Sequence, residues 1–228
     1  MSETSVIIGY GPQEYADRVD GYSPEYVRDS VIELFGNHIK GNILDAGSGD
    51  GGWIRRLQTS CQIKRVVSID FIDDGASQIP NIEFHLADLS VDKLPCGDNE
   101  FDWMFAVEVL EHLANPRNFI KDSARCLRKG GKFVITTPSN ESLRAKLSYL
   151  TRGYYPAFCE NDYHLSGHIM PILEIDIQRM AKEAGFECVD CYYPTIGLIP
   201  RFNITWQQVF PWLRGKNWSD SLVAVFTK

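Results

Sequence analysis

The sequence predicts an α/β fold, in which a mostly parallel β-sheet carries helices on both faces, and two observations support this prediction. Helical and strand-like patterns alternate along the 228 residues, without an internal repeat, a low-complexity tract or a linker. Hydrophobic residues make up 44% of the chain and charged residues 23%, which is enough apolar material for a full core. A single domain of ordinary size is therefore expected.

The elements of the first half follow in order. Ser23 and Pro24 begin a helix whose apolar residues share one face until Gly36. We then expect strands at 42–46, 65–70, 82–86, 101–107 and 132–137, with intervening helices at 52–59, 108–113 and 116–127. Asn115 and Pro116 cap the last of these helices, and the glycine pair 130–131 is expected to end it.

The pattern changes after Pro138. We expect a helix at 141–150, an irregular aromatic stretch at 154–170 and another helix at 172–184. Two strands, at 186–193 and 221–227, finish the chain, so the predicted sheet has seven strands. The segment between these two strands is rich in Trp and Phe.

Composition excludes several classes of function. Lys and Arg total 23 and Asp and Glu total 30, so the formal net charge is −7, which argues against nucleic acid as a partner. No apolar run approaches the roughly 20 residues that cross a bilayer. The first ten residues lack the basic start and apolar stretch of a signal peptide. We therefore expect a cytoplasmic protein with no transmembrane segment.

A glycine-rich turn follows the first predicted strand. The stretch LDAGSGDGG at 44–52 leads from this strand into a helix, and its glycines let the backbone approach a ligand closely. Gly47, Gly49 and Gly52 also satisfy the GxGxxG pattern of dinucleotide-binding proteins, and Asp70 would bind a ribose hydroxyl in either interpretation. The spacing alone leaves a nicotinamide-dependent oxidoreductase open.

Further motifs favour another family. LDAGSGDGG at 44–52, SID ending at Asp70, ADL at 87–89 and FDWMFAVEVLEHL at 101–113, in this order, resemble the class I S-adenosylmethionine-dependent methyltransferases. The resemblance implies a Rossmann-like, seven-stranded, mostly parallel sheet with an antiparallel final strand. It also divides the single domain into an N-terminal helical cap, a cofactor-binding half and an acceptor-side insertion with the closing strands, at 1–40, 41–138 and 139–228.

The same resemblance implies the residues that bind S-adenosylmethionine, whose product is S-adenosylhomocysteine. Gly47 and Gly49 would pass close to the methionine part of the cofactor, and Asp45 would lie near its amino group. Asp70 would accept hydrogen bonds from both ribose hydroxyls. A carboxylate suits these positions because its oxygens are acceptors only.

The adenine and sulfonium ends of the cofactor have their own candidates. Asp88 would accept a hydrogen bond from the adenine amine, with the Leu89 amide nearby. Glu108 and Val109, just past the fourth strand, would border the sulfonium and the acceptor.

Methyl transfer to a hydroxyl needs a base or a metal to remove the proton. Glu108, Glu111 and His112 are spaced to share one face of a helix, and they resemble the ExxEH of ubiquinone-pathway O-methyltransferases, which can hold a divalent cation. His112 can equally bond a backbone carbonyl, which we favour. A divalent metal is therefore considered but not expected.

Two more histidines are candidate bases. His164 and His168 lie in DYHLSGH at 162–168, after the fifth strand, where this class of fold builds its acceptor site. Their four-residue spacing would suit a metal on a helix, but Gly167 and Pro171 indicate a loop. We expect His168 or His164 to be the general base.

The acceptor is inferred from the region after Pro138. The stretches SNESLRAKLSYLTRGYYPAF at 139–158 and HLSGHIMPI at 164–172 are similar to methyltransferases that modify sugars in bacterial surface polysaccharides. A small-molecule O-methyltransferase of the quinone or natural-product type is the alternative, and an inactive partner protein is a further one. The aromatic residues of 202–218 could pack over the sheet, stack on an acceptor, contact a membrane or form a homodimer face.

Overall fold

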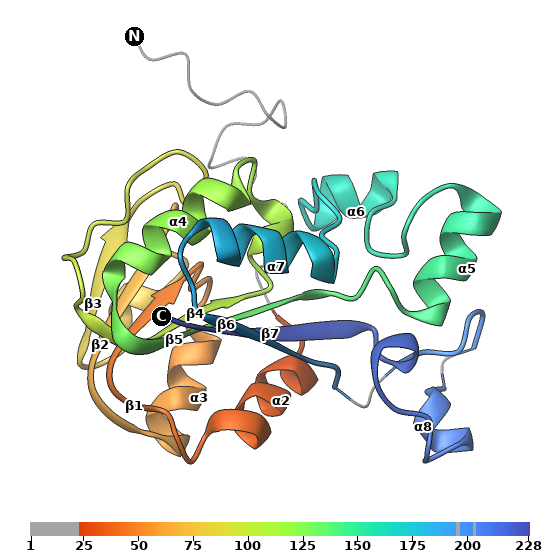
Figure 1. Cartoon of the computed structure of the whole chain (residues 1–228), viewed down its shortest axis with the longest axis horizontal. Coiled ribbons are helices and arrows are strands. Elements are labelled where there is room, and N and C mark those ends of the chain that lie inside the picture. Colours follow the sequence, from red (N-terminus) through yellow and green to blue (C-terminus); the bar gives the residue numbers. More distant parts are fainter. Residues whose placement is uncertain (1–22, 195–196, 203) are drawn as a thin grey trace, which may run out of the picture.

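The computed structural model describes residues 23–194, 197–202 and 204–228. Its centre is a seven-stranded sheet with the order β3-β2-β1-β4-β5-β7-β6 (Figure 1). The strands are β1 (Lys40–Ala46), β2 (Gln62–Asp70), β3 (Ile82–Leu86), β4 (Phe101–Val107), β5 (Leu127–Pro138), β6 (Cys188–Tyr192) and β7 (Ser221–Thr227). The predicted strands are confirmed, whereas residues 1–22 of the predicted N-terminal cap lie outside the described residues.

The direction of the strands fixes where loops can meet. β7 pairs antiparallel with β5 and β6, whereas β1 to β5 pair in parallel. The loops that follow β1, β2, β4 and β5 therefore lie at one edge of the sheet. The strand order also reverses between β1 and β4, because β2 and β3 lie on one side of β1. Proteins with open α/β sheets bind their ligands at this edge, beside such a reversal.

Helices cover both faces of the sheet (Figure 1). α2 (Glu25–Phe35) and α3 (Gly52–Ser60) pack on the face that carries Ile43 and Phe105. α4 (Pro116–Cys126) and α7 (Glu174–Glu183) pack on the face that carries Leu44 and Phe133. Ile43 and Leu44 are neighbours in β1 and point to opposite faces, as the alternation of a strand requires. The sheet is thus buried on both sides.

Shorter elements lie at the margins of the sheet: η1 (Ala76–Gln78), η2 (Leu110–His112), α5 (Leu143–Arg152), α6 (Glu160–Leu165), α8 (Trp206–Val209) and η3 (Lys216–Trp218). Figure 1 shows α5, α6 and α8 gathered at the side of the molecule away from β3. Within the Trp-rich segment, the rings of Trp206 and Trp218 pack edge to face at 5.1 Å, while Trp212 is 74% exposed. Part of that segment is therefore packed and part faces solvent.

Three local predictions are wrong. The expected helix at 108–113 is only the 3₁₀ turn η2, because Glu108 adopts a left-handed backbone with φ 55°. Gly130 and Gly131 do not end α4, since β5 begins directly after that helix by pairing with the start of β4. The stretch 154–170 is not irregular throughout, because it contains α6.

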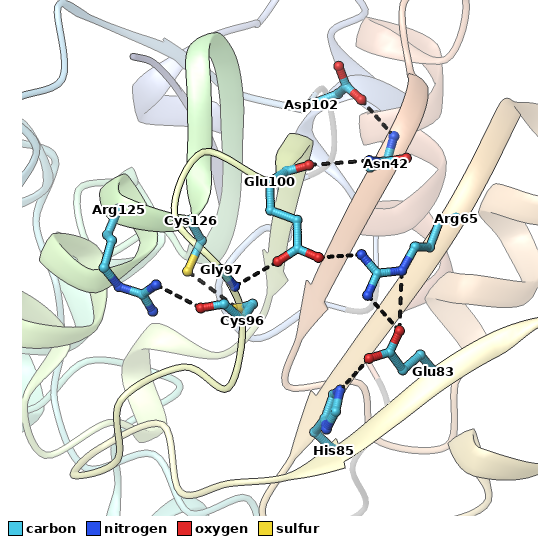
Figure 2. Close-up of polar contacts among 10 residues, drawn as sticks. All are labelled: Asn42, Arg65, Glu83, His85, Cys96, Gly97, Glu100, Asp102, Arg125 and Cys126. Atoms are coloured by element: carbon cyan, nitrogen blue, oxygen red, sulfur yellow. Dashed lines mark hydrogen bonds and ion pairs between the residues drawn. The ribbon is translucent and has the colours of Figure 1, made fainter.

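Ion pairs and hydrogen bonds close the amino-terminal edge of the sheet (Figure 2). Glu100 accepts a hydrogen bond of 2.7 Å from the backbone N–H of Gly97 and pairs with Arg65, which also pairs with Glu83 at 2.6 Å. The backbone N–H of Asn42 donates to a carboxylate on β4 at 2.7 Å. The acidic groups Glu83, Glu100 and Asp102 at this edge therefore have partners, whereas acidic groups at the opposite edge have no ion-pair partner in the described part of the chain.

We expect Phe133→Ala to lower the free energy of unfolding by about 3–5 kcal/mol, because it leaves a cavity in the larger core. The Phe133 side chain is fully buried among the rings of Phe119, Phe186 and Phe226. Urea unfolding followed by circular dichroism measures the change. Leu150→Ala is the control, since Leu150 is 78% exposed; equal losses in the two variants would contradict this description of the core.

Candidate functional site

The turn after β1 is held against the segment after β4. Gly47 has φ +80°, and a Cβ built on it would lie 2.4 Å from a methyl carbon of Val109. Only glycine combines this backbone conformation with such a close approach. The predicted cofactor turn and the predicted border of the acceptor site are therefore in direct contact.

Asp45, at the end of β1, is buried without compensation. Its side chain is 1% exposed, and one carboxylate oxygen has no hydrogen-bond partner among the described residues. Burial raises the pKa of this carboxyl to about 8, and the nearby charge of Asp70 adds to the effect. A cationic ligand would remove this penalty, because it supplies both a counter-charge and hydrogen-bond donors.

Asp70, at the end of β2, is buried but partnered. Its carboxylate accepts hydrogen bonds from the backbone N–H of Gly49 at 2.8 Å and of Phe71 at 2.7 Å. Burial raises the pKa of Asp70, and these donors partly oppose that rise. The structure thus brings Asp45, Gly47, Gly49 and Asp70 together. A ribose would share the Asp70 oxygens with the backbone, which a carboxylate with about four acceptor positions allows.

The predicted adenine-side residues lie in the turn after β3. The backbone N–H of Ala87 donates to the carbonyl of Asp70 at 2.9 Å, so this turn begins beside the end of β2. The Asp88 side chain is exposed and accepts a hydrogen bond of 2.8 Å from the backbone N–H of Ser90. Leu89 is 9% exposed and joins the larger core. Asp88 therefore stabilises the turn in which it lies, and its side chain faces solvent.

Glu108 is fixed by a threonine that the sequence analysis did not single out. The Thr136 hydroxyl accepts a hydrogen bond from the Glu108 backbone N–H at 2.9 Å and donates one to its carboxylate at 2.8 Å. Burial raises the pKa of Glu108 to about 7. A left-handed backbone at a glutamate is uncommon and marks strain of the kind that gathers at functional sites. The position of Thr136 at the end of the neighbouring strand is the signal that could have indicated it.

Glu111, His112 and His168 form a second polar group. Each side chain offers one nitrogen or oxygen atom that could bind a metal ion, and these three atoms lie within 4.8 Å of one another. Glu111 is fully buried, and its burial, together with the nearby charge of Glu108, raises its pKa well above the usual 4.5. Burial and the neighbouring His168 lower the pKa of His112 to about 3, and burial also lowers that of His168. Both imidazoles are therefore neutral at pH 7.

Of the three histidines proposed as catalytic candidates, His168, His164 and His112, the structure brings two together. His168 packs against His112, with the ring centroids 4.8 Å apart. His164 lies on α6, is partly exposed, and contacts Glu160 at 3.1 Å. The predicted placement of His164 and His168 in one loop is wrong, since α6 carries only the first of them. The predicted helical face shared by Glu108, Glu111 and His112 is also wrong, because Glu108 turns to Thr136.

The fold and these residues define a class of protein: a Rossmann-like enzyme with a glycine turn, a carboxylate after β1 and another after β2 at the ligand-binding edge. A family described as a methyltransferase domain matches residues 19–190. The chain belongs to this family. This membership replaces the nicotinamide-dependent oxidoreductase considered from the glycine spacing.

Individual relatives agree with the family. An uncharacterised protein of Methanocaldococcus jannaschii is 28% identical over 177 residues, which cover 76% of this chain and 80% of that protein. A probable S-adenosylmethionine-dependent methyltransferase of Mycobacterium tuberculosis is 28% identical over 102 residues, which cover 43% of this chain and 36% of that protein. The chain is thus an S-adenosylmethionine-dependent methyltransferase, and its match spans about a third of the mycobacterial relative's length.

More distant similarities concern the acceptor and the fold. A ubiquinone biosynthesis O-methyltransferase of Rickettsia akari is 21% identical over 154 residues, 64% of this chain and 60% of that protein. The structure of an S-adenosylmethionine-dependent methyltransferase of Thermotoga maritima, described as a possible histamine N-methyltransferase, shares the fold with a TM-score of 0.65 at 17% identity, covering 90% of this chain and 88% of that one.

In the described part of the chain, each helix is too short or too polar to cross a bilayer.

The buried Asp45 makes stability depend on pH in the absence of ligand. Its pKa in the folded protein, about 8, exceeds the ordinary value of 3.8, so the folded state binds more protons than the unfolded state between these values. The free energy of unfolding therefore decreases as the pH rises from about 4 to about 8. We expect Asp45→Asn to reduce this decrease and to be more stable than the wild type at pH 8, measured by urea unfolding.

Asp176→Asn is the matched control for this prediction, because the Asp176 side chain on α7 is 43% exposed. A wild-type pH dependence in the Asp45→Asn variant would show that the Asp45 carboxyl is not the titrating group.

Proposed function

We propose that this protein methylates a hydroxyl group of a sugar, in a surface-glycan or nucleotide-sugar pathway, with S-adenosylmethionine as the methyl donor. The observation that carries the proposal is the presence of two polar groups at the two segments that meet at the Gly47–Val109 contact. The first group consists of the buried carboxylates of Asp45 and Asp70. The second group consists of Glu108 together with Glu111, His112 and His168.

The first group suits the cofactor. The unpartnered, buried oxygen of Asp45 is an acceptor suited to an ammonium group, and Asp70 retains acceptor capacity for hydroxyls. When bound, S-adenosylmethionine supplies a methyl group on a cationic sulfur, which a nucleophile displaces in line. The Gly47 turn lets the backbone approach the ligand, and the buried Val109 side chain packs against this turn.

The second group suits an acceptor that must lose a proton. An alkyl hydroxyl has a high pKa, so its oxygen becomes a good nucleophile only when a protein group or a metal assists the loss of the proton. The two neutral imidazoles beside Glu108 provide nitrogen lone pairs at that position. An amine acceptor would need less assistance from a base or a metal. Because the site contains groups that could give such assistance, we favour oxygen over nitrogen as the methylated atom.

The region after β5 supports a sugar as the acceptor. The sequence of 139–172 resembles that of polysaccharide-modifying methyltransferases, and its aromatic residues are partly exposed. Tyr149 and Tyr155 stack at 5.2 Å between ring centroids, and Tyr149 is 54% exposed. Flat aromatic faces pack well against apolar ring surfaces. A quinone-type or natural-product acceptor is the second candidate, favoured by the similarity to the ubiquinone O-methyltransferase.

The test is the transfer of an isotope-labelled methyl group from S-adenosylmethionine into an extract of the source organism. Nucleotide-sugar and glycan, lipid and small aromatic, and protein fractions are then counted separately. Label in the sugar fraction supports the proposal. Label in the lipid or aromatic fraction favours the quinone-type acceptor, and a protein that binds the cofactor but labels no fraction would favour the inactive partner protein.

We expect Asp70→Ala to weaken the binding of S-adenosylmethionine by about 1.5–3 kcal/mol, because charge-assisted hydrogen bonds to the ribose are lost. Calorimetric titration measures the affinity. Asp74→Ala is the control, since Asp74 is an exposed acid in the loop that follows β2. Unchanged affinity in Asp70→Ala would remove Asp70 from the cofactor site.

We expect His168→Ala to lower turnover by about 10²–10⁴-fold while cofactor affinity stays nearly the same, because His168 lies on the acceptor side. His164→Ala decides between the two candidate histidines. A larger loss of turnover in His164→Ala would assign the role to α6, whereas a parallel loss of cofactor affinity in His168→Ala would show that His168 shapes the pocket.

A further inference from the structure

Glu111 has a buried carboxyl group that no ion pair in the described part of the chain compensates. The side chain is fully buried, and neither carboxylate oxygen has a hydrogen-bond partner among the described residues. A buried carboxylate is stable only with hydrogen bonds, an ion pair or a coordinated metal. The main chain at Glu111 is nevertheless well fixed, since its carbonyl accepts hydrogen bonds from the N–H groups of Ile169 at 2.9 Å and Met170 at 3.2 Å. The fold thus holds this carboxyl group firmly, with the Thr137 hydroxyl as a nearby donor and no hydrogen bond of good geometry from a described residue to either oxygen.

The two neighbouring histidines are held in one particular tautomer. The Nδ1 atom of His112 lies 3.2 Å from the carbonyl oxygen of Gly167, and that of His168 lies 2.8 Å from the carbonyl oxygen of Ala157. A carbonyl can only accept, so Nδ1 carries the hydrogen in these two contacts, and in a neutral imidazole Nε2 then has the lone pair. The Glu108 carbonyl is a second acceptor beside the His112 ring. Hydrogen bonds from the second ring nitrogen to backbone carbonyls are what orients metal-binding histidines.

The three side chains converge from separate parts of the chain. Glu111 and His112 follow β4, and His168 lies between α6 and α7; one ligand atom from each lies within 4.8 Å of the others. We propose that Glu111, His112 and His168 bind a divalent transition-metal ion whose remaining coordination positions take the hydroxyl oxygens of the acceptor. Two nitrogens and one carboxylate suit Zn²⁺, Mn²⁺ or Fe²⁺, whereas Mg²⁺ and Ca²⁺ prefer oxygen ligands.

This ligand set differs from the one suggested by the sequence spacing. There, Glu108 joined Glu111 and His112 on a helical face, but in the structure the Glu108 carboxylate is held by the Thr136 hydroxyl at 2.8 Å. His168, from the acceptor-side insertion, takes the third position. The metal therefore links the segment after β4 to the insertion that forms the acceptor side.

The proposal deepens the proposed hydroxyl methylation and rests on it only for the role of the ion. A hydroxyl that coordinates a divalent ion has a lowered pKa, so it can release its proton to water. The oxygen then forms its bond to the methyl group as the bond from that methyl group to sulfur breaks, and the electron pair of the broken bond stays on sulfur. In this arrangement His168 acts as a ligand.

The experiment uses the full chain, treated with a chelator, dialysed and titrated with Zn²⁺ and with Co²⁺ in the absence of S-adenosylmethionine. Calorimetry gives stoichiometry and affinity, and the visible absorption of Co²⁺ reports nitrogen ligation. We expect one equivalent to bind and to raise the Tm. Glu111→Gln and His168→Ala should each weaken binding by about 100-fold or more, since loss of even a residue that supports a ligand costs 10–100-fold.

Two control variants sharpen the assignment. His85→Ala removes a histidine near Glu83 at the far end of the sheet (Figure 2) and should bind the ions like the wild type. Glu108→Gln should also retain binding within a few-fold, whereas a site that used Glu108 as ligand would lose it. Circular dichroism checks folding; if Glu111→Gln does not fold, His168→Ala, at a half-buried loop position, still decides the question.

The outcomes separate this inference from the proposed function. The absence of stoichiometric binding to the wild type, or unchanged binding by Glu111→Gln and His168→Ala, would overturn the metal site. Full methyl transfer by the chelated protein would also overturn it and leave the proposed function intact. Stoichiometric binding that depends on Glu111 and His168, in a protein that methylates no hydroxyl, would support the site and contradict the proposed function.

Discussion

Buried acidic side chains without ion-pair partners at the carboxyl ends of the strands are the constraint on which this site depends. Asp45 and Asp70 lie together after β1 and β2, and Glu108 and Glu111 lie together after β4. In the described part of the chain, no ion pair reaches any of these four, whereas the charged groups at the opposite edge are paired (Figure 2). Burial of a carboxylate without an ion pair costs free energy, so a cationic ligand from outside the chain would stabilise this edge.

The sheet topology brings these acidic side chains together at one edge of the sheet. Because the strand order reverses between β1 and β4, the helices that follow these strands, α3 and α4, pack on opposite faces of the sheet. The acidic residues sit where the strands end, so the rigid sheet sets their spacing and the helices on both faces keep them buried. The elements after β5 then bring His168 to the group that follows β4, through hydrogen bonds to the Glu111 carbonyl.

The sequence predicted the strands, the fold class and the residues of the glycine turn, because these follow from local periodicity and from glycines that a ligand-binding turn requires. It did not predict the left-handed backbone of Glu108. That conformation depends on the Thr136 hydroxyl in the adjacent strand, which no local pattern reveals. It also did not predict the contact between His112 and His168. The position of His168 depends on tertiary contacts, namely its hydrogen bond to the Ala157 carbonyl and its packing against His112.

The contact between Gly47 and Val109 has a consequence for how such a chain can diverge. A Cβ at position 47 would lie 2.4 Å from a Val109 methyl group, so neither residue can grow without the other giving way. Residue 109 also follows the strained Glu108 and precedes the turn that carries Glu111. Descendants of this sequence are therefore expected to change positions 47 and 109 as a pair. The specificity for the methyl donor and the specificity for the methyl acceptor would then evolve together rather than independently.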